Sequence, residues 1–507
     1  MTSTDHIDWH RLHRITPVLN AWKVAAGLFA VFVWQSADQL GELDLAVTTL
    51  LLIIAGVVVL GALLGLGFSA LAWSRTKYGI TEDSILLHSG VLFRQQRHVR
   101  LDRLQTVDVT QPLLARFTGF AALKIESAGG AGSNLTLAYL REDEAQRLRN
   151  ELLARAAGVR METDEAGVQH APAAPEMHLY TLSPGRLVGS LALSGGIVTM
   201  LVAAVGLVVI AVVTENLSSV FAMGAPLIGA AAYFWSRFAG EFSFRVATSP
   251  DGIRIRQGLL ESKARTVPPG RVQAVRLAQP PLWRFKGWWR ITVNIAGYGA
   301  EETTGTVLFP VATEAEAAHL LSLVHPDLGD DRPLEVLRAG LTGDGDQEGF
   351  QHTPARAWWL DPLTWRRTGV RMTGTAVLLR TGRWWRSLVL VPHERIQSLG
   401  VTQGPWERKL DLMTFSIHST PGPVTPMVHH QDAEATSLLL AEMTRRARNA
   451  RRSAGPERWM TPAEEGSAAL HEGGGFGGVL PSRVVSSAGV LPASPRAMTD
   501  DPGRMAP

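Results

Sequence analysis

The sequence predicts a multi-pass membrane protein in which four transmembrane α-helices, paired as two hairpins, carry three copies of one β-rich module. Three observations predict this class. Four apolar stretches are long enough to cross a bilayer. One set of residues recurs three times at fixed spacing. The stretches form two pairs, and basic residues lie at the outer ends of each pair but not in the turn that joins its two stretches. Of 507 residues, 46% are hydrophobic and only 19% are charged, which is low for a soluble protein.

The apolar stretches match the length that a membrane helix needs, which is about 20 residues. The turns inside the two pairs hold no Lys or Arg, whereas basic residues lie at the opposite ends. Because basic loops stay on the cytoplasmic side, we expect a protein of the cell membrane with both termini and all modules on its cytoplasmic side. No ionisable residue lies at the middle of a stretch, which argues against ion or proton transport. The stretches are Val18–Gln35, Leu45–Trp73, Leu187–Val213 and Leu217–Phe238.

Composition excludes several kinds of chemistry. The chain has no cysteine, so disulfides, thiolate catalysis and cysteine-bound zinc or iron–sulfur clusters are excluded. A net charge of +3 is too small to indicate nucleic-acid binding. The first 17 residues carry both acidic and basic side chains and lack the pattern of a secretory signal peptide. No motif predicts a metal or cofactor site.

The repeat defines the modules. Counted from a reference arginine in each copy, the same residue recurs 13 and 4 positions before it and 2, 8 and 13 positions after it. Alternating apolar residues around these positions predict short antiparallel strands, with the repeated glycine in a hairpin turn. The repeated glutamine two positions on, Gln105 in the first copy, is expected to face inward and to bond backbone. The sets are Gly90, Gly258 and Gly382; Val99, Val267 and Val391; Arg103, Arg271 and Arg395; Gln105, Gln273 and Gln397; Gln111, Gln279 and Gln403; Arg116, Arg284 and Arg408.

An amphipathic helix is expected to close each copy, over Asp143–Leu153, Thr313–Leu323 and Asp432–Met443, and Thr313 with Glu316 suggests a capping box. The Gly/Asp-rich segment between the second and third copies predicts a flexible linker. The Gly, Ser, Ala and Pro-rich tail predicts disorder. The expected order is an N-terminal segment (1–17), hairpin 1 (18–73), module 1 (74–157), a linker (158–185), hairpin 2 (186–238), module 2 (239–327), a flexible linker (328–354), module 3 (355–452) and a disordered tail (453–507).

The repeated pattern resembles the membrane-flanked bacterial pleckstrin-homology (PH) domain, and three copies with paired apolar helices resemble the YdbT-like members of that family. The second copy fits best, with Val267–Pro268, Arg271, Gln273 and Gly287. The first copy has Arg100 in place of the proline, and the third has Asp411 in place of the glycine. The resemblance implies a bent antiparallel sheet capped by a C-terminal helix, no enzyme activity, links to envelope stress and toxin resistance, and a smaller single-module relative as a partner.

The hairpin tips are the candidate contact sites. Apolar residues follow the repeated glycine and basic residues surround them, as expected for a tip that enters an anionic leaflet. The alternative is that the apolar side chains fold back onto the sheet and the cations are only solvated. The third tip is the best candidate, because two exposed tryptophans are otherwise hard to explain. The candidates are Leu92, Phe93 and Arg94; Leu259, Leu260 and Lys263; and Arg383, Trp384, Trp385 and Arg386.

Two further interpretations stay open. The arginines from Arg445 to Arg452 either bind anionic lipid or complement the dipole at the C-terminus of a helix. For the whole chain we expect a non-catalytic, membrane-anchored scaffold that binds a protein, a peptide or anionic lipid. The alternative is a membrane enzyme or transporter whose site the sequence does not reveal.

Overall fold

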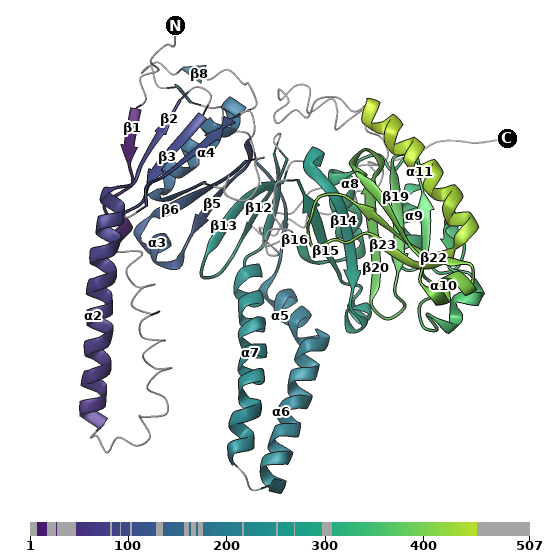
Figure 1. Cartoon of the computed structure of the whole chain (residues 1–507), viewed down its shortest axis with the longest axis horizontal. Helices are drawn as coiled ribbons and strands as arrows, with labels where there is room; N and C mark the ends of the chain where they lie inside the picture. Colours follow the sequence, from purple (N-terminus) through teal and green to yellow (C-terminus); the bar gives the residue numbers. More distant parts are fainter. Residues whose placement is uncertain are drawn as a thin grey trace, which may run out of the picture.

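A computed structural model of the 507-residue chain shows a curved row of β-sheets from which long helices project on one side (Figure 1). The α2 and α6–α7 helices point in the same direction, away from the sheets. Helix α11 lies at the far end of the row, on the other side of the last module. The structure describes residues 8–17, 27, 47–81, 84–91, 93–101, 104–127, 135–156, 162–163, 169–170, 176–214, 217–249, 252–267, 269–296 and 307–453.

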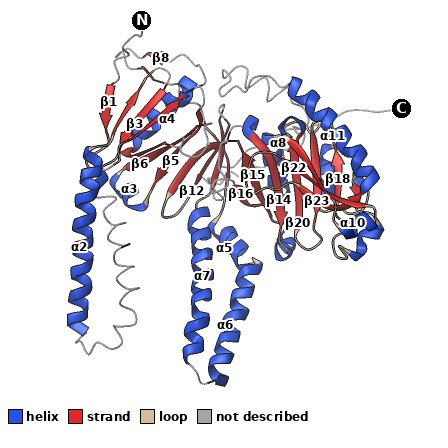
Figure 2. Cartoon of the chain, viewed as in Figure 1, coloured by secondary structure: helices blue, strands red, loops and turns tan. Residues whose placement is uncertain are grey.

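Each module contributes two groups of strands, coloured red in Figure 2. The first group holds up to four strands and the second group holds three, and a helix follows the second group. In module 1 the groups are β1 (Asp8–Arg11), β2 (Lys77–Ile80), β3 (Ser84–Ser89) and β4 (Gln95–Arg100), then β5 (Leu104–Gln111), β6 (Phe120–Ser127) and β7 (Leu135–Arg141). In module 2 they are β10 (Met177–Thr181), β11 (Arg245–Ser249), β12 (Gly252–Gln257) and β13 (Ser262–Val267), then β14 (Val272–Gln279), β15 (Trp289–Ile295) and β16 (Val307–Ala312). In module 3 they are β17 (Gln351–His352), β18 (Gly369–Met372), β19 (Ala376–Thr381) and β20 (Arg386–Pro392), then β21 (Ser398–Thr402), β22 (Leu412–His418) and β23 (Met427–Asp432).

The modules are joined through their sheets. The second group of one module pairs edge to edge with the first group of the next, so two seven-stranded sheets run across module boundaries. Strand β5 of module 1 pairs with β13 of module 2, and β14 of module 2 pairs with β20 of module 3. Two groups remain outside these sheets: the four-stranded β1–β4 and the three-stranded β21–β23. We call the two shared pairings the closed junctions.

Side chains reinforce the closed junctions. Between modules 1 and 2, Arg265 Nε lies 3.1 Å from Asp108 Oδ2, and both side chains are largely buried. Arg149 reaches across from the cap helix of module 1, donating to Val107 O at 3.2 Å and to the Thr266 hydroxyl. A buried ion pair of this kind is expensive to break, since either partner alone is left as an uncompensated charge.

The cap helices lie close to where the sequence places them, as α4 (Glu142–Ala156), α8 (Glu314–Val324) and α11 (Ala433–Ser453). The predicted capping box is confirmed: Glu316 N donates to Thr313 Oγ1 at 3.3 Å, and Thr313 N donates to Glu316 Oε2 at 2.8 Å. These reciprocal bonds satisfy amides that a helix N-terminus otherwise leaves unpaired. Helix α11 continues ten residues beyond Met443, so the arginines from Arg445 to Arg452 lie at the C-terminal end of this helix, where the sequence places them.

The turn after each hairpin glycine explains why that residue repeats. Gly258 and Gly382 have positive φ angles of 115° and 72°. A Cβ atom would lie 1.8 Å from Glu261 O in the first case and 2.0 Å from Trp385 O in the second. No other residue fits this approach. At the other predicted loop position, Asp411 adopts the left-handed φ that Gly287 adopts in module 2, so the third copy keeps the loop.

The apolar helices are inserted between the first and second strands of modules 1 and 2. Helix α2 (Val47–Ser74) leads into β2, and α5 (Pro184–Ala192), α6 (Gly195–Thr214) and α7 (Leu217–Glu241) lie between β10 and β11. Within the described residues, one helix, Gly195–Val213, has the length and composition to cross a membrane, and a shorter apolar stretch covers Val59–Ser74. The first predicted span lies outside the described residues except for residue 27. The count of four spans stays a prediction.

The predicted third span is wrong at its start. The helix is interrupted at Leu193 and Ser194, between α5 and α6, so the predicted span Leu187–Val213 forms two helices. Leu187 and Leu191 are buried in the core of module 2, and Trp283 Nε1 donates to Ser190 O at 2.9 Å. Apolar composition alone does not distinguish a helix that packs on protein from one that contacts lipid.

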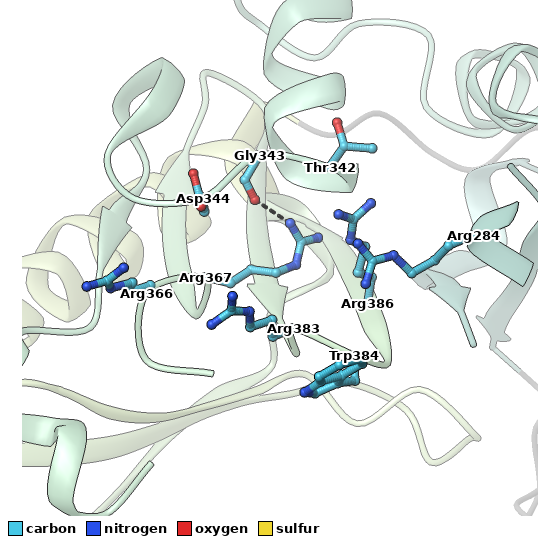
Figure 3. A pocket seen from close by; sticks show the side chains of 9 residues that line it. All are labelled: Arg284, Thr342, Gly343, Asp344, Arg366, Arg367, Arg383, Trp384 and Arg386. Atoms are coloured by element: carbon cyan, nitrogen blue, oxygen red, sulfur yellow. Dashed lines mark hydrogen bonds between the residues drawn. The ribbon is translucent and has the colours of Figure 1, made fainter. Parts of the chain in front are cut away.

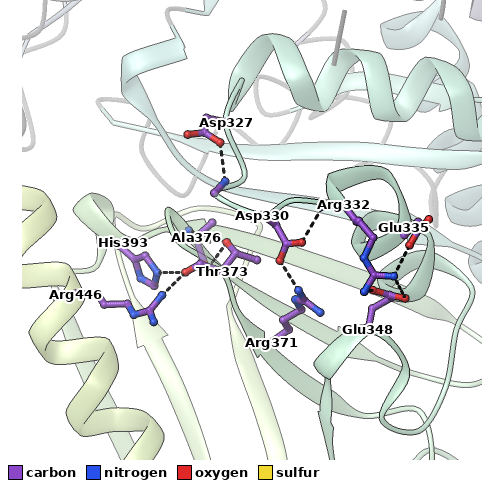
Figure 4. Close-up of polar contacts among 11 residues, drawn as sticks. Asp327, Asp330, Arg332, Glu335, Glu348, Arg371, Thr373, Ala376, His393 and Arg446 are labelled. Carbon is purple, nitrogen blue, oxygen red and sulfur yellow. Dashed lines mark hydrogen bonds and ion pairs between the residues drawn. The ribbon is translucent and has the colours of Figure 1, made fainter. Parts of the chain in front are cut away.

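The flexible linker expected over 328–354 is also wrong. It forms α9 (Pro333–Leu341) and a single 3₁₀ turn, η5 (Gln347–Gly349), and the side chains of Val336, Leu341 and Phe350 are buried. Figure 4 shows the ion pairs of this segment, in which Arg332 contacts Glu335 at 2.8 Å and Glu348 at 3.0 Å, and Arg371 of β18 contacts Asp330. Its apolar residues follow a helical spacing that the surrounding Gly and Asp residues conceal. The linker expected over 158–185 is wrong from residue 176 on, because β10 (Met177–Thr181) pairs with β11 of module 2 and α5 begins at Pro184. Most of the earlier part of that linker, and the predicted tail from residue 454, lie outside the described residues.

Candidate anion-binding site

The three hairpin tips have different surroundings. Leu92 of the first tip lies outside the described residues, while Phe93 and Arg94 are exposed. The second tip contacts the end of α7, because Leu259 N donates to Ala239 O at 2.8 Å. Leu260 is 40% exposed, and Lys263 pairs with Glu261 at 3.5 Å. The structure therefore leaves the first tip exposed and holds the second against the protein.

The third tip lines a cationic pocket of about 350 Å³ (Figure 3). Four segments meet there. The 3₁₀ turn η3 (Pro281–Lys286) supplies Arg284, the segment after α9 supplies Asp344, the loop before β18 supplies two arginines, and the β19–β20 tip supplies the rest. Arg284 and Arg386 extend toward one another from the two modules (Figure 3). The lining residues are Arg284, Thr342, Gly343, Asp344, Arg366, Arg367, Arg383, Trp384 and Arg386.

One of the pocket's five arginines is used for structure. Arg367 is buried and donates through Nη2 to Gly340 O at 3.0 Å and to Leu341 O at 2.7 Å, and through Nη1 to Gly343 O. These carbonyls lie at the C-terminal end of α9, where a positive charge is favourable. Burial, together with the positive charges of Arg380 and Arg386, lowers the pKa of Arg367 to about 9.

The other arginines carry the pocket's excess charge. Burial first and then the charge of Arg284 lower the pKa of Arg386, and Asp344 opposes this effect. Arg366 and Arg383 lie in the same lining, and Arg366 also stacks over Trp365 at 5.2 Å. Within the described part of the chain, the buried Nε atoms of Arg367 and Arg386 have no hydrogen-bond partner. Several guanidinium groups and only one carboxylate in the same lining make a site suited to a phosphate or another multivalent anion.

Exposed tryptophans surround the same module. Trp384 and Trp385 at the tip are 51% and 69% exposed. Trp359, in the 3₁₀ turn η6 (Ala355–Trp359), is 77% exposed. Trp406, in α10 (Pro405–Lys409), is 67% exposed. Tryptophan is the residue that most favours the interface between lipid headgroups and acyl chains.

The position of η6 in the module is informative. It lies between β17 and β18, the first and second strands of module 3. In modules 1 and 2 that position holds the apolar helices α2 and α5–α7. Arg356 of η6 donates to Leu410 O at 2.7 Å, which holds the turn against the end of α10. A short tryptophan-bearing turn thus stands where the other modules carry apolar helices.

Sequence reasoning located part of this site. Arg383, Trp384 and Arg386 of the predicted tip line the pocket, whereas Trp385 is exposed beside it and is not in the lining. Arg284 was recognised only as a repeated residue, and Arg366 and Arg367 were missed, because their proximity depends on how module 3 pairs with module 2. The Trp-Trp and Trp-Arg-Arg runs at 358–359 and 365–367 were the available signal.

Two of the repeated glutamines bond backbone inside their own module, whereas one repeated arginine reaches the next module. Gln273 Nε2 donates to Arg271 O at 3.3 Å, and Gln403 Nε2 donates to Leu412 O at 2.9 Å. The side chain of Gln105 lies outside the described set. Arg116 donates to Leu259 O, the tip of the next module, at 3.3 Å. Within the described residues, no group of three or more His, Asp or Glu side chains is arranged to hold a metal ion.

The comparisons with known proteins agree with this architecture. The family model described as "Bacterial PH domain" matches residues 28–156, 189–327 and 349–444. The chain is also similar to the UPF0699 transmembrane protein YdbT of Bacillus subtilis (strain 168), at 23% identity over 291 residues. That alignment covers 51% of this chain and 58% of the relative, so the chain spans less than two thirds of the relative's length.

Proposed function

The chain belongs to the bacterial PH domain family, whose model matches more than half of its length, and we propose that it is a membrane-anchored, non-catalytic array whose third module binds the phosphate of an anionic lipid. The carrying observation is the pocket whose lining combines Arg284, Arg383 and Arg386 with a single carboxylate, that of Asp344. The similarity to a transmembrane protein supports a place at the membrane.

The tryptophans favour a lipid over a free anion. Trp384 lines the pocket, and Trp385 is exposed immediately beside it. In Figure 1, α10 lies at the end of module 3 that faces the same way as the α6–α7 helices. A lipid whose phosphate enters the pocket would therefore place its glycerol and acyl region near these indole rings. A free phosphate would use the arginines alone.

The expected cytoplasmic orientation is consistent with this proposal, since the inner leaflet carries anionic lipid. The link to envelope stress or toxin resistance stays a prediction. The alternative, a hidden enzyme or transporter, stays open; among the described residues it gains no support from a metal site, since no group of three or more His, Asp or Glu side chains could hold a metal ion.

The test is a binding titration of the full chain in neutral detergent. The probes are dioctanoyl phosphatidylglycerol, dioctanoyl phosphatidylcholine and inorganic phosphate. We expect the first to bind, and the double variant Arg366→Glu/Arg383→Glu to weaken binding by about tenfold or more, because charge-assisted hydrogen bonds are lost. The matched control is Arg141→Glu/Arg147→Glu, which makes the same charge change on exposed residues of module 1.

Each arm has a defined meaning. Equal binding of phosphatidylglycerol to both double variants would overturn the proposal. Binding of inorganic phosphate as tight as that of the lipid would show that the pocket takes a free anion and that the tryptophans add nothing. Equal binding of phosphatidylcholine would show that the contact is apolar only.

A further inference from the structure

The two ends of the module row carry complementary open edges. Strand β4 is the last strand of the first group in module 1, and within the described residues it pairs with β3 alone. Strand β21 is the first strand of the second group in module 3, and among the described strands it pairs with β22 alone. At the closed junctions, the counterparts of β4 are β13 and β20, and the counterparts of β21 are β5 and β14. Each chain therefore has one open edge of each kind.

The closed junctions follow one register. Positions are counted from the reference arginine of each module, and position +8 of one module lies opposite position −9 of the next. Because the strands are antiparallel, each step back along the first strand is a step forward along the second. In the first junction the pairs are Gln111 with Ser262, Thr110 with Lys263, and Val109 with Ala264. In the second junction the pairs are Gln279 with Arg386, Ala278 with Ser387, and Leu277 with Leu388.

We propose that β21 of one chain pairs antiparallel with β4 of a second copy, in this same register, to form a third junction between molecules. The rule then specifies every pair. Gln403 lies opposite Arg94, Thr402 opposite Gln95, Val401 opposite Gln96, Gly400 opposite Arg97, and Leu399 opposite His98. The interface is a continuation of two interfaces that the chain already contains.

The exposure of these strands fits a missing neighbour. Val401 is 48% exposed, whereas its counterparts Val109 and Leu277 are 2% and 0% exposed. The first four residues of β4 are exposed, while those of β20 are mostly buried. Strand ends that a module covers inside the chain are therefore uncovered at the ends of the chain.

The polar sequence of β4 does not argue against pairing. Charged side chains often protect an open edge from aggregation. Strand β13, however, carries Lys263 and Arg265, and it pairs with β5 nonetheless. Its arginine is matched by Asp108 across the junction. A strand of this composition is thus a working partner within this same fold.

The arrangement in the membrane supports a second copy as the partner. Helices α2 and α6–α7 project in the same direction, although successive modules carry them (Figure 1). The step from one module to the next thus preserves that direction, and the same step between chains keeps both copies in one membrane. Because this interface joins two different surfaces, repeated steps generate a ring or a row rather than a two-fold dimer.

The absence of cysteine in the chain allows a direct test. Two differently tagged copies, one with Val401→Cys and one with Gln96→Cys, are expressed together in membranes and oxidised. We expect a disulfide-linked heterodimer, because opposite residues of paired strands have Cα atoms within the range that a disulfide spans. The mismatched pair, Val401→Cys with His98→Cys, should give about tenfold less product, since diagonal neighbours are farther apart. Val109→Cys/Ala264→Cys in one chain calibrates the same positions at a closed junction.

The outcomes are decisive. Equal products from the matched and mismatched pairs would overturn the register. No heterodimer, with the calibrating disulfide formed, would overturn the pairing. Cross-linking of Val401→Cys to a protein other than the second copy would assign the edge to another occupant and overturn the proposed pairing of two copies.

Discussion

Strands β14 and β21 are the same strand in two successive modules, yet their surroundings differ. In β14, Leu277 lies opposite Leu388 of the next module and is 0% exposed, whereas Val401 at the same position of β21 is 48% exposed. The two modules share the reference arginine, the loop glutamine and the cap helix. In this chain the second strand group of modules 1 and 2 is thus completed by the next module, and the structure describes no such neighbour for module 3.

The largest expected effect comes from truncating the covered side chain. Leu277→Ala should cost about 2–5 kcal/mol of unfolding free energy, because it leaves a cavity in a closed junction. Val401→Ala should cost less than about 1 kcal/mol, since an exposed side chain loses few contacts. Thermal unfolding of both variants in detergent, at low protein concentration, measures the difference. Equal losses would mean that the covering strand contributes nothing.

Acid should weaken the junction between modules 2 and 3. Burial lowers the pKa of His325 to about 4, with Asp327 opposing and His393 adding to the effect, and the ring bonds the Thr375 hydroxyl of module 3 at 2.9 Å. The unfolded chain binds the proton near pH 6.5 and the folded chain does not, so stability falls as pH drops from 6.5 toward 4. At pH 5 the loss should be about 2 kcal/mol.

The measurement is unfolding of the parent and of His325→Asn at pH 7.5 and pH 5. The variant cannot titrate at this position, so its loss between the two pH values should be smaller by about 2 kcal/mol. An identical pH dependence in both proteins would show that His325 is not the group that senses acid at this junction.

The smallest effect concerns the repeated arginine 13 positions after the reference. Arg116 donates to Leu259 O of the next module, so Arg116→Ala should cost about 0.5–1.5 kcal/mol. Arg408 occupies the same position in module 3, after which the structure describes no further module. Arg408→Ala should be neutral in dilute detergent and should reduce the cross-linking of two copies in membranes. A cost for Arg408→Ala in dilute detergent would contradict this distinction.

Sequence reasoning predicted the features that are local or repeated. The three modules, the hairpin glycines and the capping box of Thr313 follow from spacing and from local sterics. It failed where an answer depends on packing between segments. Leu187 was assigned to a membrane span and Val336 to a flexible linker, yet both side chains are buried in the same hydrophobic core. The residues they pack against are distant in sequence, so no local pattern predicts this burial. Sequence reasoning predicted only part of the pocket for the same reason. Arg284 of module 2 comes close to the residues of module 3 because β14 pairs with β20.

Hydrogen–deuterium exchange of the two equivalent strands tests the central claim most directly, namely that one module completes the next. In a dilute detergent solution of single chains, the amides of β14 should all be protected, because β15 and β20 lie on its two sides. Alternate amides of β21 should exchange fast, since antiparallel strands direct successive amides to opposite sides and β22 covers one side. Equal protection of the two strands in the single chain would contradict the account.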